Sequence, residues 1–384
     1  MVHCDCASVC FVMADSSLSS KPFTFERLCE LCACQQRLFS FLRFHKVLFN
    51  FHGRCERCLN GFINIRQDKL ASEGQIWRCS NTRHCNCKIA IRKHSFFSGS
   101  NLRIHVIVKV IYFWTHRYPQ HIVVHETGLN PKTLTDFYNF CREVCYTILQ
   151  QHTEPIGGPG TVVEIDESKF GKRKYNRGKR VDGVWVFGGI ERDTTPPKCF
   201  FLTVEDRSAA TLIPIIKQYI LPGTTIVSDC WKSYSSLRDE GFLHQTVNHS
   251  IEFVSESGAH TNNIESRWNA LKKSLPRYGT RKDLYDSYFA EYCIRRKFLS
   301  GSSDPFLAFL QLVGVVYKPP QPLSQQQEQL PTADLASAAH AGLLSTTPTV
   351  PTSTLSPQDI ATFDLGFEID IEPDYLATGG DISI

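Results

Sequence analysis

The order of apolar segments between residues 162 and 298 constrains the fold of this chain more than any other feature. Segments rich in β-branched and aromatic residues come first, and helix-like and strand-like segments then alternate. Such residues favour strands, and strands followed by this alternation pack as a mixed sheet covered by helices. We therefore predict an α/β domain. Its strands are expected at 162–166, 184–192, 199–206, 224–229 and 243–249, and its helices at 210–220, 231–240, 262–275 and 282–298.

The sequence before this segment has helical character in two places. Apolar residues recur at three- and four-residue steps from Phe25 to Leu48, which predicts a helix. The same periodicity over 102–150 is interrupted by Gly128 and Pro131. This pattern is typical of a helix-turn-helix, with Asn130 as the N-cap of the second helix. An ordinary helical hairpin would look the same, so DNA binding by this region is a hypothesis.

A short segment between these helical regions, residues 54–94, is polar and rich in cysteine. Cys55 and Cys58 form one close pair, and Cys79 is followed by Cys85 and Cys87. Two such pairs are what a tetrahedral zinc ribbon requires. We find no convincing signal peptide, so the 16 cysteines of the chain favour zinc in a reducing compartment over a disulfide framework.

The charge is unevenly distributed along the chain. All 42 Lys and Arg residues precede Pro319, whereas nine of the 38 acidic residues follow it. A basic folded part favours a polyanionic partner, because Lys and Arg set against phosphates release counterions. The segment 319–384 is rich in Pro, Gln, Ser and Thr, and we predict a disordered acidic tail. No apolar run approaches the roughly 20 residues of a membrane span, so no membrane partner is expected.

The densest group of positive charges follows the first predicted strand, at 169–180. We expect it to form a hairpin that lies along a DNA path, although a solvated loop or a nuclear import signal has the same composition. A nuclear location is therefore expected. The basic residues of this run are Lys169, Lys172, Arg173, Lys174, Arg177, Lys179 and Arg180.

Acidic residues stand at the ends of two predicted strands and at the start of a predicted helix. Asp166 closes the strand VVEID, Asp229 closes TTIVSD, and Glu265 lies in the first turns of the helix that follows SESGAH. If the two strands are neighbours, these carboxylates meet at one edge of the sheet. Phosphoryl transfer by a divalent-ion pair needs such a group, and oxygen ligands select Mg²⁺ or Mn²⁺. Taken singly, each residue is more often a helix cap or an exposed surface residue.

Three blocks of sequence resemble a known family. EIDESKFG, SDCWKSY and HTNNIESRWNALKK are similar, in order and spacing, to the motif blocks of the ISXO2-like transposase domain. That family includes the bacterial IS1595 and IS1016 elements and the eukaryotic Merlin transposons. The resemblance covers 160–298 and is weaker through the cysteine-rich region. It implies an RNase H-like fold and a DDE catalytic site in which Asp166, Asp229 and Glu265 hold two Mg²⁺ or Mn²⁺ ions.

The resemblance also bears on the zinc ligands. Related sequences have one cysteine shortly before a segment similar to Ala90-Ile91-Arg92. On that basis the expected ligands are Cys55, Cys58, Cys79 and Cys85, while Cys87 and His84 remain competitors for the last position.

Residues near the acidic group are expected to support it. His260 and Asn262 would orient a scissile phosphate or cap the helix that bears Glu265. Lys272 lies seven residues after Glu265, hence on the same helical face, where its ammonium group would hold a DNA phosphate. Glu164 shares a strand face with Asp166 and is a candidate for a supporting role. Two aromatic residues, Trp231 and Tyr234, follow Asp229. We expect both to pack in the core rather than to stack on bases.

These expectations combine into one organisation. An irregular N-terminus with a helix (1–50) precedes a zinc-ribbon-like module (51–100), a helix-turn-helix-like region (101–153), an RNase H-like domain (160–300) and the tail (319–384). The expected activity is transposase-type cleavage and strand transfer on double-stranded DNA, by a homodimer or a higher oligomer. Two alternatives stay open: a transposase-derived host protein that binds DNA and regulates chromatin without cutting, and an RNase H-type nuclease.

Overall fold

The computed structural model describes residues 23–151, 154–171, 183–247, 260–276 and 280–318, all of which belong to one compact unit, Met1–Pro322. The predicted acidic tail and most of the predicted basic hairpin lie outside the described residues. Within the described part of the chain, no helix is both long enough and apolar enough to span a membrane.

The expected N-terminal helix is two helices. These are α1 (Phe25–Ala33) and α2 (Gln35–Phe44). They are separate because Cys34 has extended backbone angles, φ −121° and ψ 111°, which no helix can accommodate. Thr24 caps α1 by accepting a hydrogen bond from the Arg27 amide.

The cysteine-rich region forms a small antiparallel sheet with its strands in chain order. The strands are β1 (Gly53–Arg54), β2 (Phe62–Gln67), β3 (Gln75–Cys79) and β4 (Lys88–Ala90). The cysteines lie in the turns between these strands or at strand ends. Short strands joined by tight turns therefore bring distant cysteines together.

Three helices follow, α3 (Ile104–Thr115), α4 (Gln120–Thr127) and α5 (Pro131–Gln151). The expected break at Gly128 and Pro131 is confirmed. Gly128 ends α4 in the left-handed region, with φ 65°, where glycine carries no Cβ penalty. The Asn130 side chain accepts a hydrogen bond from the Lys132 amide, 2.9 Å away, at the start of α5. A second break, before Pro119, was not expected.

The central sheet is mixed, which confirms the predicted α/β class. Its strand order is β11-β10-β6-β7-β8. The first three strands along the chain pair antiparallel, whereas β10 and β11 run parallel to β6. A separate two-stranded pair is formed by β5 (Ile156–Gly157) and β9 (Ile220–Leu221). The sheet strands are β6 (Val162–Phe170), β7 (Val184–Glu191), β8 (Cys199–Val204), β10 (Thr225–Asp229) and β11 (Leu243–Val247).

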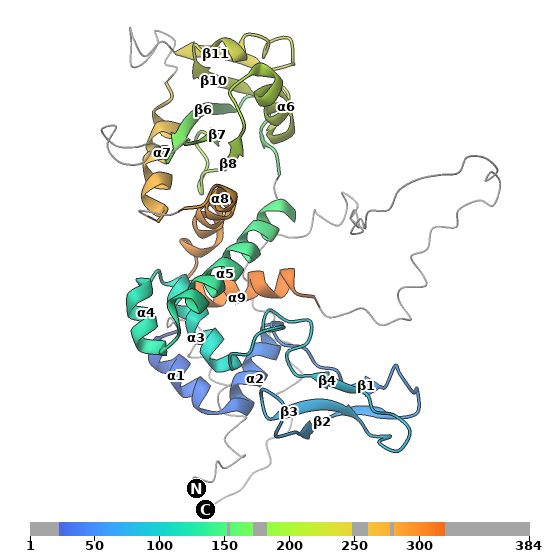
Figure 1. Ribbon diagram of the computed structural model, residues 1–384. Coiled ribbons are helices and arrows are strands. Elements are labelled where there is room, and N and C mark those ends of the chain that lie inside the picture. The colour runs from blue at the N-terminus through green and yellow to red at the C-terminus, as the bar shows by residue number, and fades with distance from the viewer. Residues whose placement is uncertain (1–22, 152–153, 172–182, 248–259, 277–279, 319–384) are drawn as a thin grey trace, which may run out of the picture. The chain divides into compact units, whose positions relative to one another are not determined.

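Helices cover both faces of this sheet (Figure 1). Val163 and Ile165 of β6 pack in a core with α6 (Ala209–Tyr219). The opposite face carries Phe170 and Val186, in a core with α7 (Asn262–Ser274) and α8 (Tyr285–Ile294). Because strand side chains alternate, Glu164 and Asp166 share the face covered by α7.

Three expected elements differ from the structure. The helix predicted at 231–240 is wrong, since only a 3₁₀ turn forms there (Lys232–Tyr234), and the Trp231 indole and the Ser233 hydroxyl tie this turn to the Arg207 carbonyl. The helix predicted at 282–298 is shorter: α8 is flanked by a 3₁₀ turn (Lys282–Leu284) and a π-helical turn (Arg295–Leu299). Helix α9 (Pro305–Val316), capped by Asp304, was not predicted.

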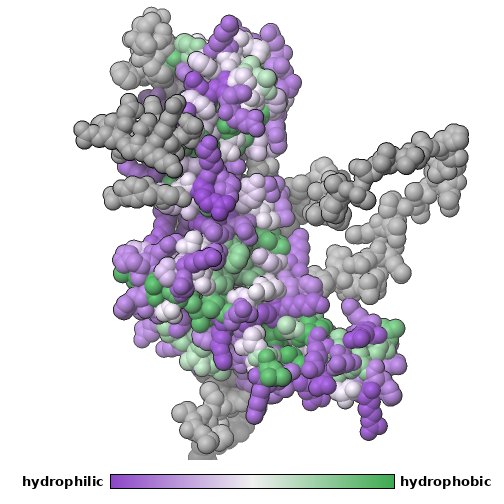
Figure 2. Space-filling model, viewed as in Figure 1, coloured by the Kyte–Doolittle hydropathy of each residue, from purple (hydrophilic) through white to green (hydrophobic). Residues whose placement is uncertain are grey.

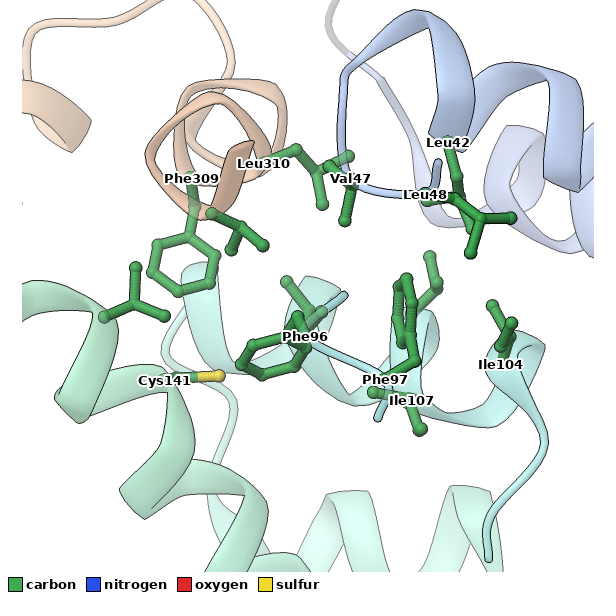
Figure 3. Close-up of a cluster of buried hydrophobic side chains, with 14 of the residues drawn as sticks. Leu42, Val47, Leu48, Phe96, Phe97, Ile104, Ile107, Cys141, Phe309 and Leu310 are labelled. Atoms are coloured by element: carbon green, nitrogen blue, oxygen red, sulfur yellow. The ribbon is translucent and has the colours of Figure 1, made fainter. Parts of the chain in front are cut away.

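Helix α9 completes a hydrophobic core built mostly from the N-terminal half of the chain. Figure 3 shows Phe309 and Leu310 among side chains from α2, α3 and α5. Leu42, Phe97 and Phe309 are fully buried. On the face shown in Figure 2, hydrophilic residues cover most of the surface, with smaller hydrophobic areas between them.

Candidate functional site

Two of the three expected carboxylates lie on neighbouring strands. Strand β10 is parallel to β6, with Val227 opposite Glu164. Two residues further along each strand, Asp229 comes level with Asp166 on the same face of the sheet. Asp166 does not end its strand as expected. It lies inside β6, because β7 continues to pair with β6 as far as Phe170.

The third carboxylate, Glu265, lies on α7, a helix that is joined to β6 by a side-chain hydrogen bond. Glu265 lies in the first turn of α7 and is exposed. Three residues further on, the Trp268 indole donates a hydrogen bond of 2.8 Å to Asp166 Oδ2. This role of Trp268 was not predicted from the sequence, although a residue three positions after Glu265 lies on the same face of the helix.

The Asp166 carboxyl is electrostatically linked to the other two acids. Burial raises its pKa to about 6, and the negative charges of Asp229 and Glu265 add to the increase, while the Trp268 bond opposes it. Among the described residues, these three carboxylates do not form a cluster with all ligand oxygens within 4.8 Å of one another.

Glu164 anchors the start of α7. Its side chain is fully buried and accepts hydrogen bonds of 3.0 Å from the backbone amides of Asn263 and Ile264. The Asn263 side chain and the Arg192 guanidinium donate to it as well, over 2.8 and 2.7 Å. A carboxylate from β6 thus satisfies amides that a helix start leaves unpaired. The supporting role expected of Glu164 is a structural one.

The two residues expected to cap α7 or orient a phosphate do not cap it. Asn262 is the first residue of the helix and is exposed. His260 places Nδ1 3.5 Å from Glu164 Oε1, and its carbonyl accepts a hydrogen bond from Arg192. Glu164 takes the capping role instead.

Lys272 lies beside the strand that bears Asp166. Its ammonium group donates a 2.7 Å hydrogen bond to the Ser168 hydroxyl and is 5.2 Å from the centre of the Phe170 ring. Burial lowers its pKa, and the Asp166 charge opposes that shift. The side chain is therefore held close to the acidic group.

The two aromatic residues after Asp229 differ in their surroundings. Tyr234 is fully buried, as expected, and its hydroxyl donates a hydrogen bond to Glu167. Burial raises the pKa of Glu167 to about 7, partly offset by this bond. Trp231 is 39% exposed, so the expectation that it packs in the core is wrong.

A second site is formed by four cysteines. The ligand atoms of Cys55, Cys58, Cys79 and Cys85 all lie within 4.8 Å of one another, and among the described residues no other group of three or more potential ligands does so. Two Sγ–Sγ distances, Cys55 to Cys85 and Cys58 to Cys79, are 3.7 Å. Cys87 and His84 are outside this group.

The cysteine cluster has the dimensions of a zinc site. Four sulfurs placed tetrahedrally at about 2.3 Å from zinc are about 3.8 Å apart, whereas a disulfide needs about 2.05 Å. The thiols also differ in acidity. Burial raises the pKa of Cys79 to about 12, whereas backbone amides and neighbouring thiols outweigh burial at Cys55 and lower its pKa to about 6. A cation bound among the four thiols would favour their ionised forms.

Of the predicted basic run, only Lys169 among its charged residues is described. It lies in β6, exposed, with Nζ 5.2 Å from the centre of the Trp185 ring. Phe170 pairs with Val184, so the run connects two antiparallel strands. Lys172, Arg173, Lys174, Arg177, Lys179 and Arg180 lie outside the described residues.

Comparison with known proteins agrees with these motifs. Residues 155–298 match the family described as the ISXO2-like transposase domain. An uncharacterized transposase-like protein of Haemophilus influenzae is 32% identical over 95 residues, which are 24% of this chain and 76% of that protein. A simian T-cell lymphotropic virus intasome in complex with PP2A regulatory subunit B56 gamma is 16% identical, covering 61% of this chain and 80% of that one. Its TM-score of 0.26 supports no inference. By its motifs and its relative, the chain belongs to the ISXO2-like transposase family.

Proposed function

We propose that this protein cuts and joins DNA by metal-dependent phosphoryl transfer. Asp166, Asp229 and Glu265 would hold two Mg²⁺ or Mn²⁺ ions. The observation that carries the proposal is the alignment of Asp166 with Asp229 on parallel neighbouring strands, with the helix of Glu265 bonded to Asp166 through Trp268. The mixed five-stranded sheet supports the RNase H-like fold that the motifs imply.

When bound, the ions would activate the attacking oxygen and stabilise the leaving oxygen. The protein supplies positioning. The Trp268 bond fixes one oxygen of Asp166, and Glu164 fixes the helix that carries Glu265. Lys272 is close enough to Asp166 to pair with a phosphate of the bound strand.

The proposed reaction has two stages. Water cleaves a strand at a transposon end, and the resulting 3′-hydroxyl then attacks a target phosphate in line, with no covalent enzyme intermediate. Handling paired ends calls for a dimer or a larger assembly. In a cell with a nucleus, the chromosomal DNA on which this reaction acts lies in the nucleus. The proposed location of the protein is therefore the nucleus.

DNA binding would fall to the regions outside the acidic group. The helix pair α4 and α5 and the basic run between β6 and β7 are the proposed contacts with double-stranded DNA. The four-cysteine site would hold a structural zinc ion, because its sulfur spacing fits tetrahedral coordination. Binding zinc would fix the turns that join β1 to β2 and β3 to β4.

The test is a DNA-nicking assay on the full chain with Mg²⁺ or Mn²⁺. We expect Asp229→Asn to lower the rate at least about a hundredfold, the size of effect seen when one electrostatic stabiliser of a transition state is removed. The matched control is Asp239→Asn, an exposed aspartate of the same domain, which should keep the wild-type rate. Equal rates for Asp229→Asn and wild type would contradict the proposal. A wild-type protein that binds DNA but never nicks it would favour the non-cutting regulator.

A further inference from the structure

Two tryptophans and an arginine form a cluster at the end of β10 that carries Asp229, with Trp185 on the face of the sheet that packs against α6. The Arg207 guanidinium lies 4.2 Å from the centre of the Trp185 ring and 4.3 Å from that of Trp231. These are stacking distances for a cation on an aromatic face. We call these three residues the tryptophan–arginine cluster.

The cluster is joined to Asp229 through the main chain of Trp231. The Trp231 amide donates a 3.0 Å hydrogen bond to Asp229 Oδ1. The Trp231 indole and the Ser233 hydroxyl both donate to the Arg207 carbonyl, over 3.1 and 2.7 Å. The loop before α6 and the turn after β10 are thus tied together next to a proposed metal ligand.

Trp231 remains accessible although its ring is oriented by these contacts. It is 39% exposed, in contrast to the fully buried Tyr234 three residues later. Lys232 is exposed beside it, and the Lys169 ammonium lies 5.2 Å from the Trp185 ring. A fixed, exposed aromatic ring among positive charges suits a ligand that is both flat and anionic.

We propose that Trp231 stacks on an unpaired nucleobase adjacent to the scissile phosphate, with Arg207 supporting the ring from behind. This inference rests on the proposed function, because it takes Asp229 as a ligand of the catalytic ions. Indole stacking accepts any base, so the cluster positions a separated strand without reading its sequence. Trp231 is therefore a positioning residue, and its partner is the frayed end of the DNA rather than the intact duplex.

The experiment compares two DNA probes of the same sequence, a blunt duplex and a forked duplex with unpaired bases at one end. Binding to the full chain is measured without added Mg²⁺ or Mn²⁺, so that the proposed cutting reaction does not consume the probes. We expect Trp231→Leu to weaken forked-duplex binding about ten- to a hundredfold and blunt-duplex binding less than about twofold. Trp231→Phe, which keeps an aromatic face, should retain most of the affinity for the fork.

A second measurement uses the wild-type protein, so it does not depend on a variant that folds. With 2-aminopurine at the unpaired position, stacking on Trp231 should quench its emission when the protein binds. Equal losses on both probes for Trp231→Leu, no loss on either, or unquenched 2-aminopurine would overturn the inference.

Asp229→Asn separates this inference from the proposed function. That variant should still prefer the fork and quench 2-aminopurine while losing nicking activity. If Asp229→Asn nicks DNA normally, the proposed function fails. If only the fork preference of the wild type is missing, the stacking inference alone fails.

Discussion

Removing the Glu164 side chain should cost far more stability than removing an exposed glutamate with an equally close partner. Glu164 has no exposed surface and accepts four hydrogen bonds of 2.7–3.0 Å, one of them from Arg192. Removing one partner of a buried ion pair typically costs about 3–5 kcal/mol, because the other charge then stays buried without a partner. Arg192 keeps 16% of its side chain exposed, which relieves part of that cost. For Glu164→Ala we therefore expect about 3 kcal/mol.

The matched control is Glu240→Ala. Glu240 is 2.6 Å from Lys217, as close as Glu164 is to Arg192, but the two side chains are 32% and 54% exposed. Exposed ion pairs contribute about 0–1 kcal/mol, so this variant should unfold nearly as the wild type does. Only burial and the contacts with α7 distinguish the two glutamates.

The assay is urea unfolding of the full chain, followed by far-ultraviolet circular dichroism and tryptophan fluorescence. Glu164→Gln provides an intermediate point, because its amide oxygen still accepts from α7 while the charge facing Arg192 is lost. We expect it to cost about 1.5–3 kcal/mol, the range for a hydrogen bond to a charged group. A Glu164→Ala protein no less stable than Glu240→Ala would refute the proposed anchoring of α7.

Further predictions concern zinc, pH and packing. Cys55→Ser should abolish stoichiometric zinc in metal analysis of the full chain, whereas Cys87→Ser should retain it, and equal zinc in both would exclude the four-cysteine site. Burial lowers the pKa of His45 from 6.5 to about 4, so its neutral form stabilises the fold above pH 6.5. That contribution is lost as pH falls toward 4, so between pH 7 and pH 5 the free energy of unfolding of the wild type should change by about 2 kcal/mol less favourably than that of His45→Gln; equal changes in the two proteins would contradict the prediction. Gly188→Ala would place a methyl group 2.6 Å from the Phe201 ring and 2.8 Å from Trp268, and should cost about 1–3 kcal/mol in urea unfolding; a neutral result would mean that both rings can move aside.

The strands of the central sheet could be predicted from sequence because their composition is distinctive. The β-branched runs around Val163 and Ile226 identify β6 and β10, and both strands formed. The full length of β6 could not be predicted. Its second half, from Glu167 to Lys169, is polar and is held in the sheet by pairing with β7 rather than by its own composition.

The candidate site was only partly accessible to sequence reasoning. Acidic residues in motif blocks pointed to Asp166, Asp229 and Glu265, but the contacts that hold them join residues far apart in the chain. Glu164 and Asn263 are 99 positions apart, and no local pattern indicates that they meet. The exposure of Trp231 could not be predicted either. A tryptophan near the end of a strand is expected to be buried in the core, and only the positions of its neighbours show that it is exposed.

The position of α9 changes how the chain can be divided for experiments. Its apolar residues share a core with α1, α2, α3 and α5, so the polypeptide leaves that core after α5 and returns to it through α8 and α9. The segment that carries the proposed metal ligands is thus an insertion in the helical unit, and both of its ends join that unit. A stop codon placed just after residue 298 would keep every proposed catalytic carboxylate but would remove α9. The hydrophobic core of the N-terminal half would then lose the apolar side chains that α9 contributes.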